Sequence, residues 1–354
     1  MPSDADTSSS SPGGHATTGQ QEQRKARTMM QARSEVPEPE RSAQETIRDY
    51  LLENGWETSR GDNHFKKQRA VADKRSASST DFFYAMMNTI AIDLDRATDV
   101  LRLDEVEQPA LLDMCVAPGG FVDTAAALSR NPDIYIRAMS LPVEQGGHAV
   151  KILDTKVDVE YRDITTLAAD MGITEDDVPL NFPGPHDFLF ENVLGDNEKF
   201  DLVFCDGQVL RTHPRAEWRE PREATRLTLT QIALGLEHMK KDGTMLYKHH
   251  KHHKIRSSFY LVAKNIQPES ALAKEMAAMW KQRYKIATFG TDEEYAEMHR
   301  VTRETALVEL EKFGEKYVAM GKKIWKTQAD GLEKAPFLEK HTKEQSKRRI
   351  WKMW

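Results

Sequence analysis

The stretch DMCVAPGGF, which begins at Asp113, constrains the fold more than any other part of this 354-residue chain. Apolar residues 110–112 precede the acid, a Pro-Gly-Gly turn follows it, and an alanine-rich run comes next. This order predicts a strand, a tight turn and a helix. Gly119 and Gly120 would let the backbone approach a ligand closely, and the helix would offer its first amides to that ligand. A purely structural corner is the alternative for this segment alone.

Two further segments have the form of buried strands that end at a charged residue. DLVFCDG, from Asp201, contains an apolar run before Asp206, and GTMLYK, from Gly243, ends at Lys248. Continuous apolar runs are typical of parallel strands that are covered on both faces. Ligands bind at the carboxyl ends of such strands. We therefore expect Asp113, Asp206 and Lys248 to face one crevice.

Together these segments resemble the FtsJ-like ribose 2′-O-methyltransferases, and the flanking segments are similar to a divergent fungal branch. The resemblance covers roughly residues 65–290. It also rests on SLPVEQGGH, YRDITTL and SSFYLVAKN, which begin at Ser140, Tyr161 and Ser257. It implies an α/β fold with a Rossmann-like methyltransferase sheet and helical N- and C-terminal extensions. It also implies S-adenosyl-L-methionine (SAM) as cofactor and an RNA as partner, without distinguishing rRNA, tRNA or an mRNA cap.

The resemblance implies a cofactor site built from the glycine turn and from the ends of several strands. The residues that it assigns to this site are Asp113, Ala117, Pro118, Gly119, Gly120, Phe121, Ser140, Leu141, Asp163 and Asp206. Related enzymes often place an acid toward the ribose at the end of the second strand, and this sequence has Ser140 there. Asp163 would read the adenine amino group, and a helix N-cap is the alternative for the same residue.

The chemistry implied by the resemblance needs few groups, because methyl transfer from a sulfonium is a direct displacement. Proximity and orientation supply most of its rate. The family uses a Lys-Asp-Lys-Glu set to position the ribose hydroxyl and to stabilise the developing alkoxide. Asp206 and Lys248 match the two central members. The predicted activity is therefore SAM-dependent methylation of a ribose 2′-hydroxyl of RNA.

The two outer members of the catalytic set are where the sequence departs from the family. Ala85 falls near the position of the first lysine, and Ser258 stands where the glutamate is expected. Lys66 and Lys67 are the substitutes that the sequence offers for the lysine, and a merely basic surface is their alternative. The alternative function is thus a catalytically degenerate relative that binds RNA or a protein partner without methyl transfer.

Only nine residues, 249–257, separate Lys248 from Ser258, where the family has a helix and an additional strand. The sheet is therefore predicted to lack one helix and one edge strand after Lys248. The strand that begins near Phe259 should pair antiparallel with the strand of Lys248. Four histidines in the junction are adjacent in pairs and lie among lysines. We predict no metal site there, and a basic loop instead.

The segment RTHPRAEWREPREATR follows the strand of Asp206 directly. Arginines bind phosphates and an aromatic ring can stack on an unpaired base, so RNA contact is the first hypothesis for this segment. Interspersed glutamates favour the alternative, a salt-bridged start of a helix. The residues that carry the first hypothesis are Arg211, Arg215, Trp218, Arg219, Arg222 and Arg226.

Composition sets the frame of these expectations. The formal charge of -6 gives no general nucleic-acid signature, so an RNA surface must be local. Two cysteines, and no apolar run long enough to span a bilayer, predict an intracellular protein of the cytoplasm or nucleus. The domains expected are a disordered tail (1–40), a helical extension (41–105), the FtsJ-like domain (106–290) and a helical C-terminal extension with a basic tail (291–354).

Overall fold

The computed structural model describes residues 59–72, 77–152, 157–247 and 260–335. Residues Phe65–Ala335 form one compact unit, and Met1–His64 with Pro336–Trp354 form a second. The expected tail (1–40) and the basic C-terminus lie outside the described residues. The strands are β1 (Ala110–Asp113), β2 (Tyr135–Ser140), β3 (Asp158–Tyr161), β4 (Phe200–Cys205), β5 (Met239–Tyr247) and β6 (Leu261–Ile266). The α-helices are α3 (Ser59–Ala72), α4 (Ala77–Thr98), α5 (Gly120–Ser129), α6 (Glu223–Glu237), α7 (Ala271–Phe289), α8 (Asp292–Met298) and α9 (Arg303–Glu333).

A single sheet in the order β3-β2-β1-β4-β5-β6 forms the centre of the larger unit. All pairs from β3 to β5 are parallel. Every residue of β1 is buried, which explains why this strand reads as a continuous apolar run that only its last residue, Asp113, interrupts. The predicted Rossmann-like α/β sheet is confirmed.

Strand β6 pairs antiparallel with β5, as the short junction predicted. Tyr247 and Leu261 are register partners, and β6 is the last strand in the sheet order. Within the described residues the sheet therefore has no strand beyond β6. None of the six residues of β6 is fully buried, and Leu261 is 42 % exposed. Lys248, the histidines and Ser258 lie outside the described residues.

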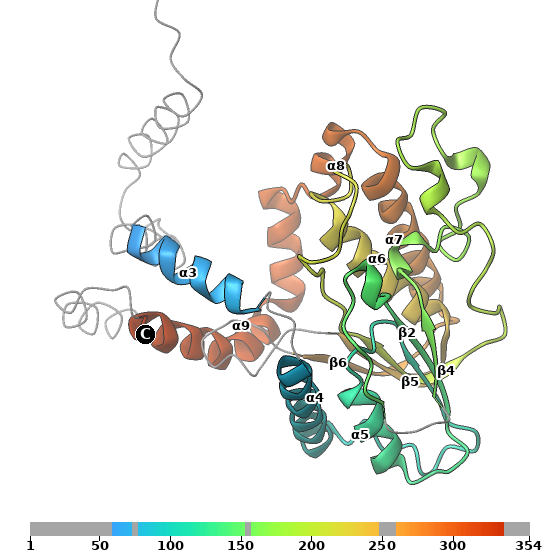
Figure 1. Cartoon of the computed structure of the whole chain (residues 1–354), viewed down its shortest axis with the longest axis vertical. Coiled ribbons are helices and arrows are strands. Elements are labelled where there is room, and N and C mark those ends of the chain that lie inside the picture. Colours follow the sequence, from blue (N-terminus) through green and yellow to red (C-terminus); the bar gives the residue numbers. More distant parts are fainter. Residues whose placement is uncertain (1–58, 73–76, 153–156, 248–259, 336–354) are drawn as a thin grey trace, which may run out of the picture. The chain divides into compact units, whose positions relative to one another are not determined.

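Two helical layers cover the sheet. Helices α4 and α5 lie on one face, where Met87 and Phe121 pack against Leu202 and Leu246. Helices α6 and α7 lie on the other face (Figure 1), where Leu234 belongs to a core shared with all the parallel strands except β3. Burial on both faces is what a parallel sheet requires.

Helix α7 begins at a residue that caps it. The Ser270 Oγ atom accepts a hydrogen bond from the backbone N–H of Ala273 (3.2 Å). Because the first amides of a helix have no partner within the helix, such a side chain stabilises its start. The next helix, α8, has a capping box, in which Thr291 and Glu294 each bond the other's backbone N–H.

Ser270→Ala is expected to lower the free energy of unfolding by about 1 kcal/mol, because it removes this N-cap. Urea unfolding followed by circular dichroism would measure the loss. The control is Thr89→Ala. Thr89 is exposed, and its hydroxyl donates to the Ala85 carbonyl within α4 without capping a helix. A midpoint as high as that of Thr89→Ala would show that the cap contributes nothing.

Helix α9 presents apolar side chains that are about half exposed. Leu310 is 52 % exposed and Tyr317 is 51 % exposed. Charged residues alternate with these apolar ones.

In the part of the chain that the structure describes, neither α9 nor any other helix is long and apolar enough to cross a bilayer.

Candidate cofactor and substrate site

The site lies where the strand order reverses. Strand β1 has β2 on one side and β4 on the other, so the chain connections diverge at the carboxyl end of β1. Open α/β sheets bind ligands at such a point. A cavity of about 460 Å³ is found there, within the size range of small-molecule sites. Its lining includes six of the predicted cofactor residues, namely Ala117, Pro118, Ser140, Leu141, Asp163 and Asp206.

The other predicted cofactor residues do not line this cavity. Asp113 is completely buried, and its Oδ1 atom accepts a hydrogen bond from the Cys115 backbone N–H (3.0 Å). This bond shapes the turn that carries Ala117 and Pro118 to the cavity. Phe121 packs between Phe204 and Tyr260, with ring centroids 5.4 and 5.5 Å away. Asp113 and Phe121 therefore contact residues that line the cavity, namely Cys115 and Tyr260, without lining it themselves.

The two glycines of the turn are required by packing. Gly119 has a φ of 110°, which side-chain-bearing residues rarely adopt, and a Cβ atom there would collide with Ile152. A Cβ atom on Gly120 would lie 2.6 Å from the Tyr84 carbonyl oxygen. The approach at Gly120 lets α5 pack against α4, and the approach at Gly119 lets Ile152 pack against the turn. In this structure both glycines allow close packing within the protein, and neither lines the cavity.

Asp206 and its neighbours form a second tight turn. Asp206 follows β4 directly, is 4 % exposed and lines the cavity. The next amide, that of Gly207, donates to Gln231 Oε1 of α6 (2.7 Å). A Cβ atom on Gly207 would collide with Cys115. The turn after β4 is therefore held against the turn after β1, which keeps the Asp206 carboxyl group at the cavity.

The remaining predicted catalytic residues are not brought to the cavity in the described part of the chain. Lys66 is an exposed residue of α3, and it is not among the described residues that line the cavity. Ala85 is exposed on α4, whereas its neighbours Phe83 and Met86 line the cavity. Lys248 comes directly after the last residue of β5 and is outside the described residues. Its role stays a prediction.

Asp163 is a helix N-cap, one of the two interpretations that the sequence left open, and it also lies at the cavity where the other interpretation requires it. It is the N-cap of the short 3₁₀ helix Ile164–Thr166, because its Oδ1 atom accepts from the Thr165 backbone N–H (3.0 Å). It also lines the cavity. Its Oδ2 atom accepts a hydrogen bond from Nη2 of Arg219 (2.6 Å). The same Arg219 nitrogen lies 2.6 Å from Glu223 Oε1.

This arrangement fixes the charges of the group. Burial opposes ionisation of Asp163, but the charge of Arg219 and the hydrogen bonds from Arg219 and Thr165 outweigh it and lower the pKa of Asp163. Burial alone would lower the pKa of Arg219, but Glu223 and Asp163 raise it. Asp163 is therefore a carboxylate at neutral pH. A carboxylate only accepts hydrogen bonds, so it suits a ligand N–H group.

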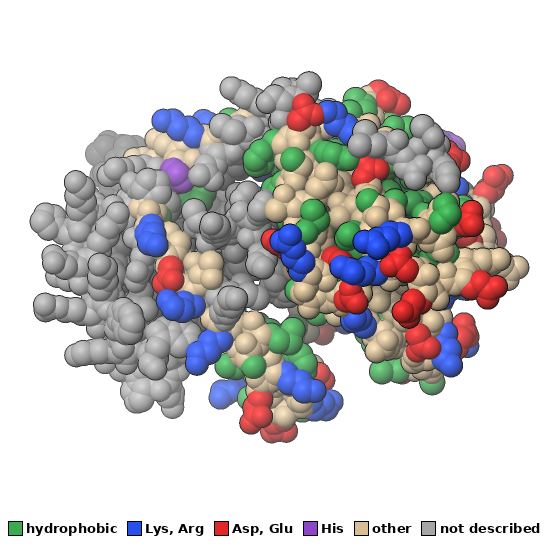
Figure 2. All heavy atoms as spheres, turned by 90° about the horizontal axis from the view of Figure 1, so that it is seen from below, with side chains coloured by type: hydrophobic (Ala, Val, Ile, Leu, Met, Phe, Trp, Pro, Cys, Tyr) green, Lys and Arg blue, Asp and Glu red, His purple; other side chains and the backbone are tan. Residues whose placement is uncertain are grey.

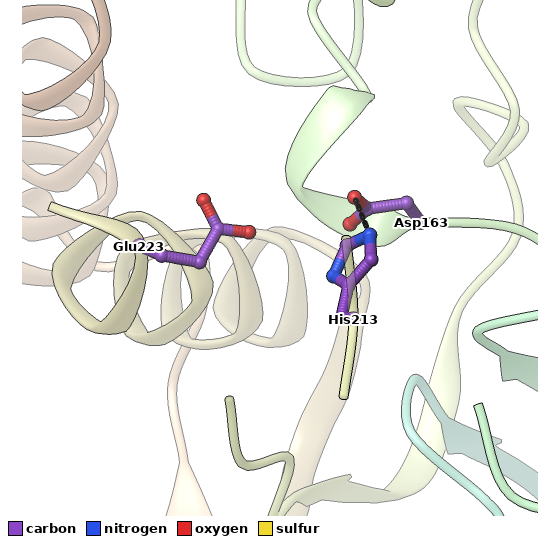
Figure 3. Close-up of side chains that lie close together, drawn as sticks. All are labelled: Asp163, His213 and Glu223. Carbon is purple, nitrogen blue, oxygen red and sulfur yellow. Dashed lines mark ion pairs between the residues drawn. The ribbon is translucent and has the colours of Figure 1, made fainter. Parts of the chain in front are cut away.

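Asp163, His213 and Glu223 place three metal-ligating groups within 4.8 Å of one another. Figure 3 shows His213 beside Asp163, with Glu223 extending from α6 toward them. Burial lowers the pKa of His213 although Asp163 opposes this, so its ring is uncharged at neutral pH. The guanidinium of Arg219 already pairs with both carboxylates. A metal ion would have to displace a buried cation, so we interpret the group as an ion-pair network.

The arginine-rich segment differs from the RNA-contact hypothesis. Arg219, Arg222 and Arg226 are 6 %, 9 % and 0 % exposed, so the prediction that they contact RNA is wrong. They form ion pairs and hydrogen bonds within the protein, as the alternative of a salt-bridged helix start stated. Trp218 is packed against Phe182, with ring centroids 4.6 Å apart. The three arginines and Trp218 therefore stabilise the start of α6 through ion pairs and ring packing.

The first two arginines of the segment remain at the cavity. Arg211 is exposed and lines it. The guanidinium of Arg215 pairs with Glu220 (2.5 Å) and donates to the Leu210 carbonyl (2.7 Å). Arg215 therefore shapes the loop, whereas Arg211 is an exposed arginine of the cavity lining.

Comparison with known families decides the class of the protein. The FtsJ-like methyltransferase family matches residues 91–268, half of the chain. The chain belongs to the FtsJ-like methyltransferase family. This confirms the resemblance drawn from the motifs, without bearing on a fungal branch. A search of the curated proteins found no match.

Several solved structures are similar to part of the chain. CalS10, a SAM-bound amino pentose methyltransferase from Micromonospora echinaspora, is 13% identical, with 49% of this chain and 56% of that chain covered (TM-score 0.26). TrmN from Thermus thermophilus is 14% identical, with 46% and 37% covered (TM-score 0.25). DesVI from Streptomyces venezuelae is 13% identical, with 49% and 57% covered (TM-score 0.26). The matched part spans about half the length of these chains or less.

The cofactor of this methyltransferase family is SAM, and the residues of the cavity fit it. The cavity has an ionised carboxylate, Asp163, for a nucleoside N–H group, and the backbone of Ala117 and Pro118 at the end of β1. Ser140 replaces the acid expected toward the ribose, and its buried hydroxyl can donate or accept a hydrogen bond there.

Sequence reasoning missed several residues that build this site. Thr165, His148, Glu223 and Tyr260 line the cavity, and none was assigned to it from the sequence. Gly146, with a φ of 97°, packs so closely on the loop after β4 that a Cβ atom would collide with Thr212. The Gly-Gly pair after β2 was a signal for this close approach.

Proposed function

We propose that this FtsJ-like protein transfers a methyl group from SAM to a ribose 2′-hydroxyl of RNA. The observation that carries the proposal is that Asp163 and Asp206, on loops after β3 and β4, line one cavity at the strand ends. One carboxylate suits the nucleoside of the donor, and the other lies where an acceptor hydroxyl would need orientation. The cofactor itself supplies the electrophilic methyl group.

Asp206 is the described residue that would act on the acceptor. It is almost fully buried, so its hydrogen bonds would be stronger than in water. Cys205 and Tyr247 are register partners on the parallel strands β4 and β5, and Asp206 and Lys248 are the residues that follow them in the chain. We propose that this pair orients the hydroxyl and stabilises the alkoxide as the methyl group is transferred.

RNA as acceptor is supported by local rather than general charge. The chain is acidic as a whole, and basic and acidic side chains are intermixed on the face shown in Figure 2. Arg211 is an exposed arginine that lines the cavity. A phosphate adjacent to the acceptor ribose would meet it there. Two free cysteines fit the expected cytoplasm or nucleus.

A catalytically degenerate relative is the second candidate function. The observation that favours it is the exposed Ala85 on α4, which brings no lysine to the cavity. Such a protein would still bind SAM or RNA. Transfer of radiolabelled methyl groups to a pool of unmodified transcripts separates the two functions. Label in alkali-resistant dinucleotides shows 2′-O-methylation, because a methylated ribose cannot assist cleavage of the adjacent phosphodiester.

The cofactor site is tested first by titrating SAM into the full chain by calorimetry. Asp113→Ala is expected to abolish the heat of binding, because Asp113 holds the turn that carries Ala117 and Pro118 to the cavity. Asp133→Ala removes an exposed acid from the loop before β2 and serves as the matched control. Equal binding by both variants would contradict a site at the end of β1.

A further inference from the structure

A chain of buried hydrogen bonds connects the cavity wall to helix α7, which lies beyond the matched family segment. The chain starts at the Asp163 carboxylate. Its Oδ1 atom is bonded to the N–H (3.0 Å) and to the hydroxyl (2.8 Å) of Thr165. The Thr165 carbonyl in turn accepts from Tyr284 of α7 (2.5 Å) and from Nη2 of Arg226 (2.8 Å). Tyr284 and Arg226 are both completely buried.

The second arm of this chain runs through α6. Arg219 donates to Asp163 Oδ2, to the Thr165 hydroxyl (2.8 Å) and to Glu223. Glu223 also accepts from Arg226 (2.9 Å), which closes the two arms into one network. The network therefore fixes the Asp163 carboxylate from both of its oxygens. Each charged group of the network has an oppositely charged partner within the protein, as a buried polar network requires.

The bonds leave Asp163 with a defined remaining capacity. A carboxylate oxygen can accept about two hydrogen bonds. Within the described residues, Oδ1 is used by the two donors of Thr165, and Oδ2 is used once by Arg219. His213 Nε2, at 3.8 Å from Oδ2, is beyond hydrogen-bond distance. One acceptor position on Oδ2 is thus available on a residue that lines the cavity.

We propose that Arg219, and Tyr284 acting through Thr165, are positioning residues that aim this Oδ2 position at the exocyclic amino group of the cofactor's base. The proposal rests on the proposed function, because it requires SAM in the cavity. It gives a helix outside the family segment a role in nucleoside selection. The selected chemistry is a nucleoside with an amino group, against one with a carbonyl oxygen in its place.

The test compares two ligands that differ in that group. S-adenosyl-L-homocysteine has the amino group, and S-inosyl-L-homocysteine has a carbonyl oxygen that would face the carboxylate without a hydrogen bond. Calorimetry on the full chain is expected to give at least a tenfold preference for the adenosyl form, since a charge-assisted hydrogen bond is at stake. Arg219→Met should reduce adenosyl affinity about tenfold and leave inosyl affinity within about twofold.

Two more variants separate positioning from stability. Tyr284→Phe removes only the hydroxyl that bonds Thr165, and it should reduce the preference about threefold. Arg219→Lys retains the charge and should restore part of the preference lost in Arg219→Met. Arg222→Met is the matched control, because it removes a buried arginine of the same segment that pairs with Asp292 and the Gly290 carbonyl instead. Its preference should equal that of the unaltered chain.

Each outcome is decisive. An equal loss of affinity for both ligands in Arg219→Met and Tyr284→Phe would show a structural role only and would overturn the proposal. A lack of preference in the unaltered chain would overturn it as well, while leaving the cofactor site intact. If the unaltered chain binds neither ligand, the proposed function itself fails. If Arg219→Met does not fold, as thermal melting would show, Tyr284→Phe decides alone.

Discussion

Lys248→Ala is expected to reduce methyl transfer at least about 100-fold while SAM affinity stays within about twofold. The reason is geometric. Strands β4 and β5 are parallel neighbours in register at Cys205 and Tyr247, and Asp206 follows the first of these while Lys248 follows the second. Asp206 lines the cavity. The lysine is predicted to act on the hydroxyl and not on the donor.

Methyl transfer to RNA and SAM binding by calorimetry would be measured for the same preparation. Lys241→Ala is the matched control, because Lys241 is an exposed lysine on the same strand. It should leave both quantities unchanged. A parallel loss of transfer and of SAM affinity in Lys248→Ala would refute the predicted role. It would mean that the lysine holds the donor or the fold instead.

Arg226→Met is expected to lower the free energy of unfolding by about 3 kcal/mol or more. Arg226 is fully buried, and its guanidinium donates to Glu223, to the Thr165 carbonyl and to Thr288. Removing one partner from a buried ion pair leaves the other charge without full compensation, which costs about 3–5 kcal/mol. The second partner of Glu223, Arg219, keeps the expected loss near the lower end of that range.

Urea unfolding of the full chain would measure this loss against Arg300→Met. Arg300 is 68 % exposed in its side chain and pairs with Glu297 within one turn, so its ion pair should contribute less than about 1 kcal/mol. Similar midpoints for the two variants would contradict a stabilising role for the buried network. The slope of the transition must stay constant for the comparison to hold.

The parallel strands could be predicted from the sequence because their signal is local. The apolar runs before Asp113 and Asp206 are continuous, and the structure places both in the centre of the sheet. The antiparallel pairing of β6 followed from the shortness of the junction after Lys248. Each of these features depends on neighbouring residues or on chain length alone.

The arginines show where local signals fail. The segment from Arg211 to Arg226 has the composition of an RNA-binding surface, yet its last three arginines are buried. What buries it is α7 and the loop of Asp163, which is 56 residues away from Arg219 in the chain. Sequence spacing could have indicated the short-range pairs of Glu223 with Arg219 and Arg226. The long-range partner depends on the assembled fold.

Asp163 shows why two interpretations of one residue need not exclude each other. The N-cap bond uses Oδ1, whereas Oδ2 is bonded to Arg219, and the residue also lines the cavity. A sequence identifies an acid before a short helix without showing how its two oxygens divide their bonds. That division would let a capping residue also serve as a ligand-binding residue.

The relation between the family segment and helix α7 has a consequence for how this protein is divided. The matched segment ends at residue 268, but Ala277, Tyr284 and Ala287 belong to the same hydrophobic core as β1 and β4. The family match therefore ends inside one hydrophobic core. We expect the residues on either side of this boundary to unfold together. The segment that sequence similarity identifies is therefore shorter than the segment that contributes to this core.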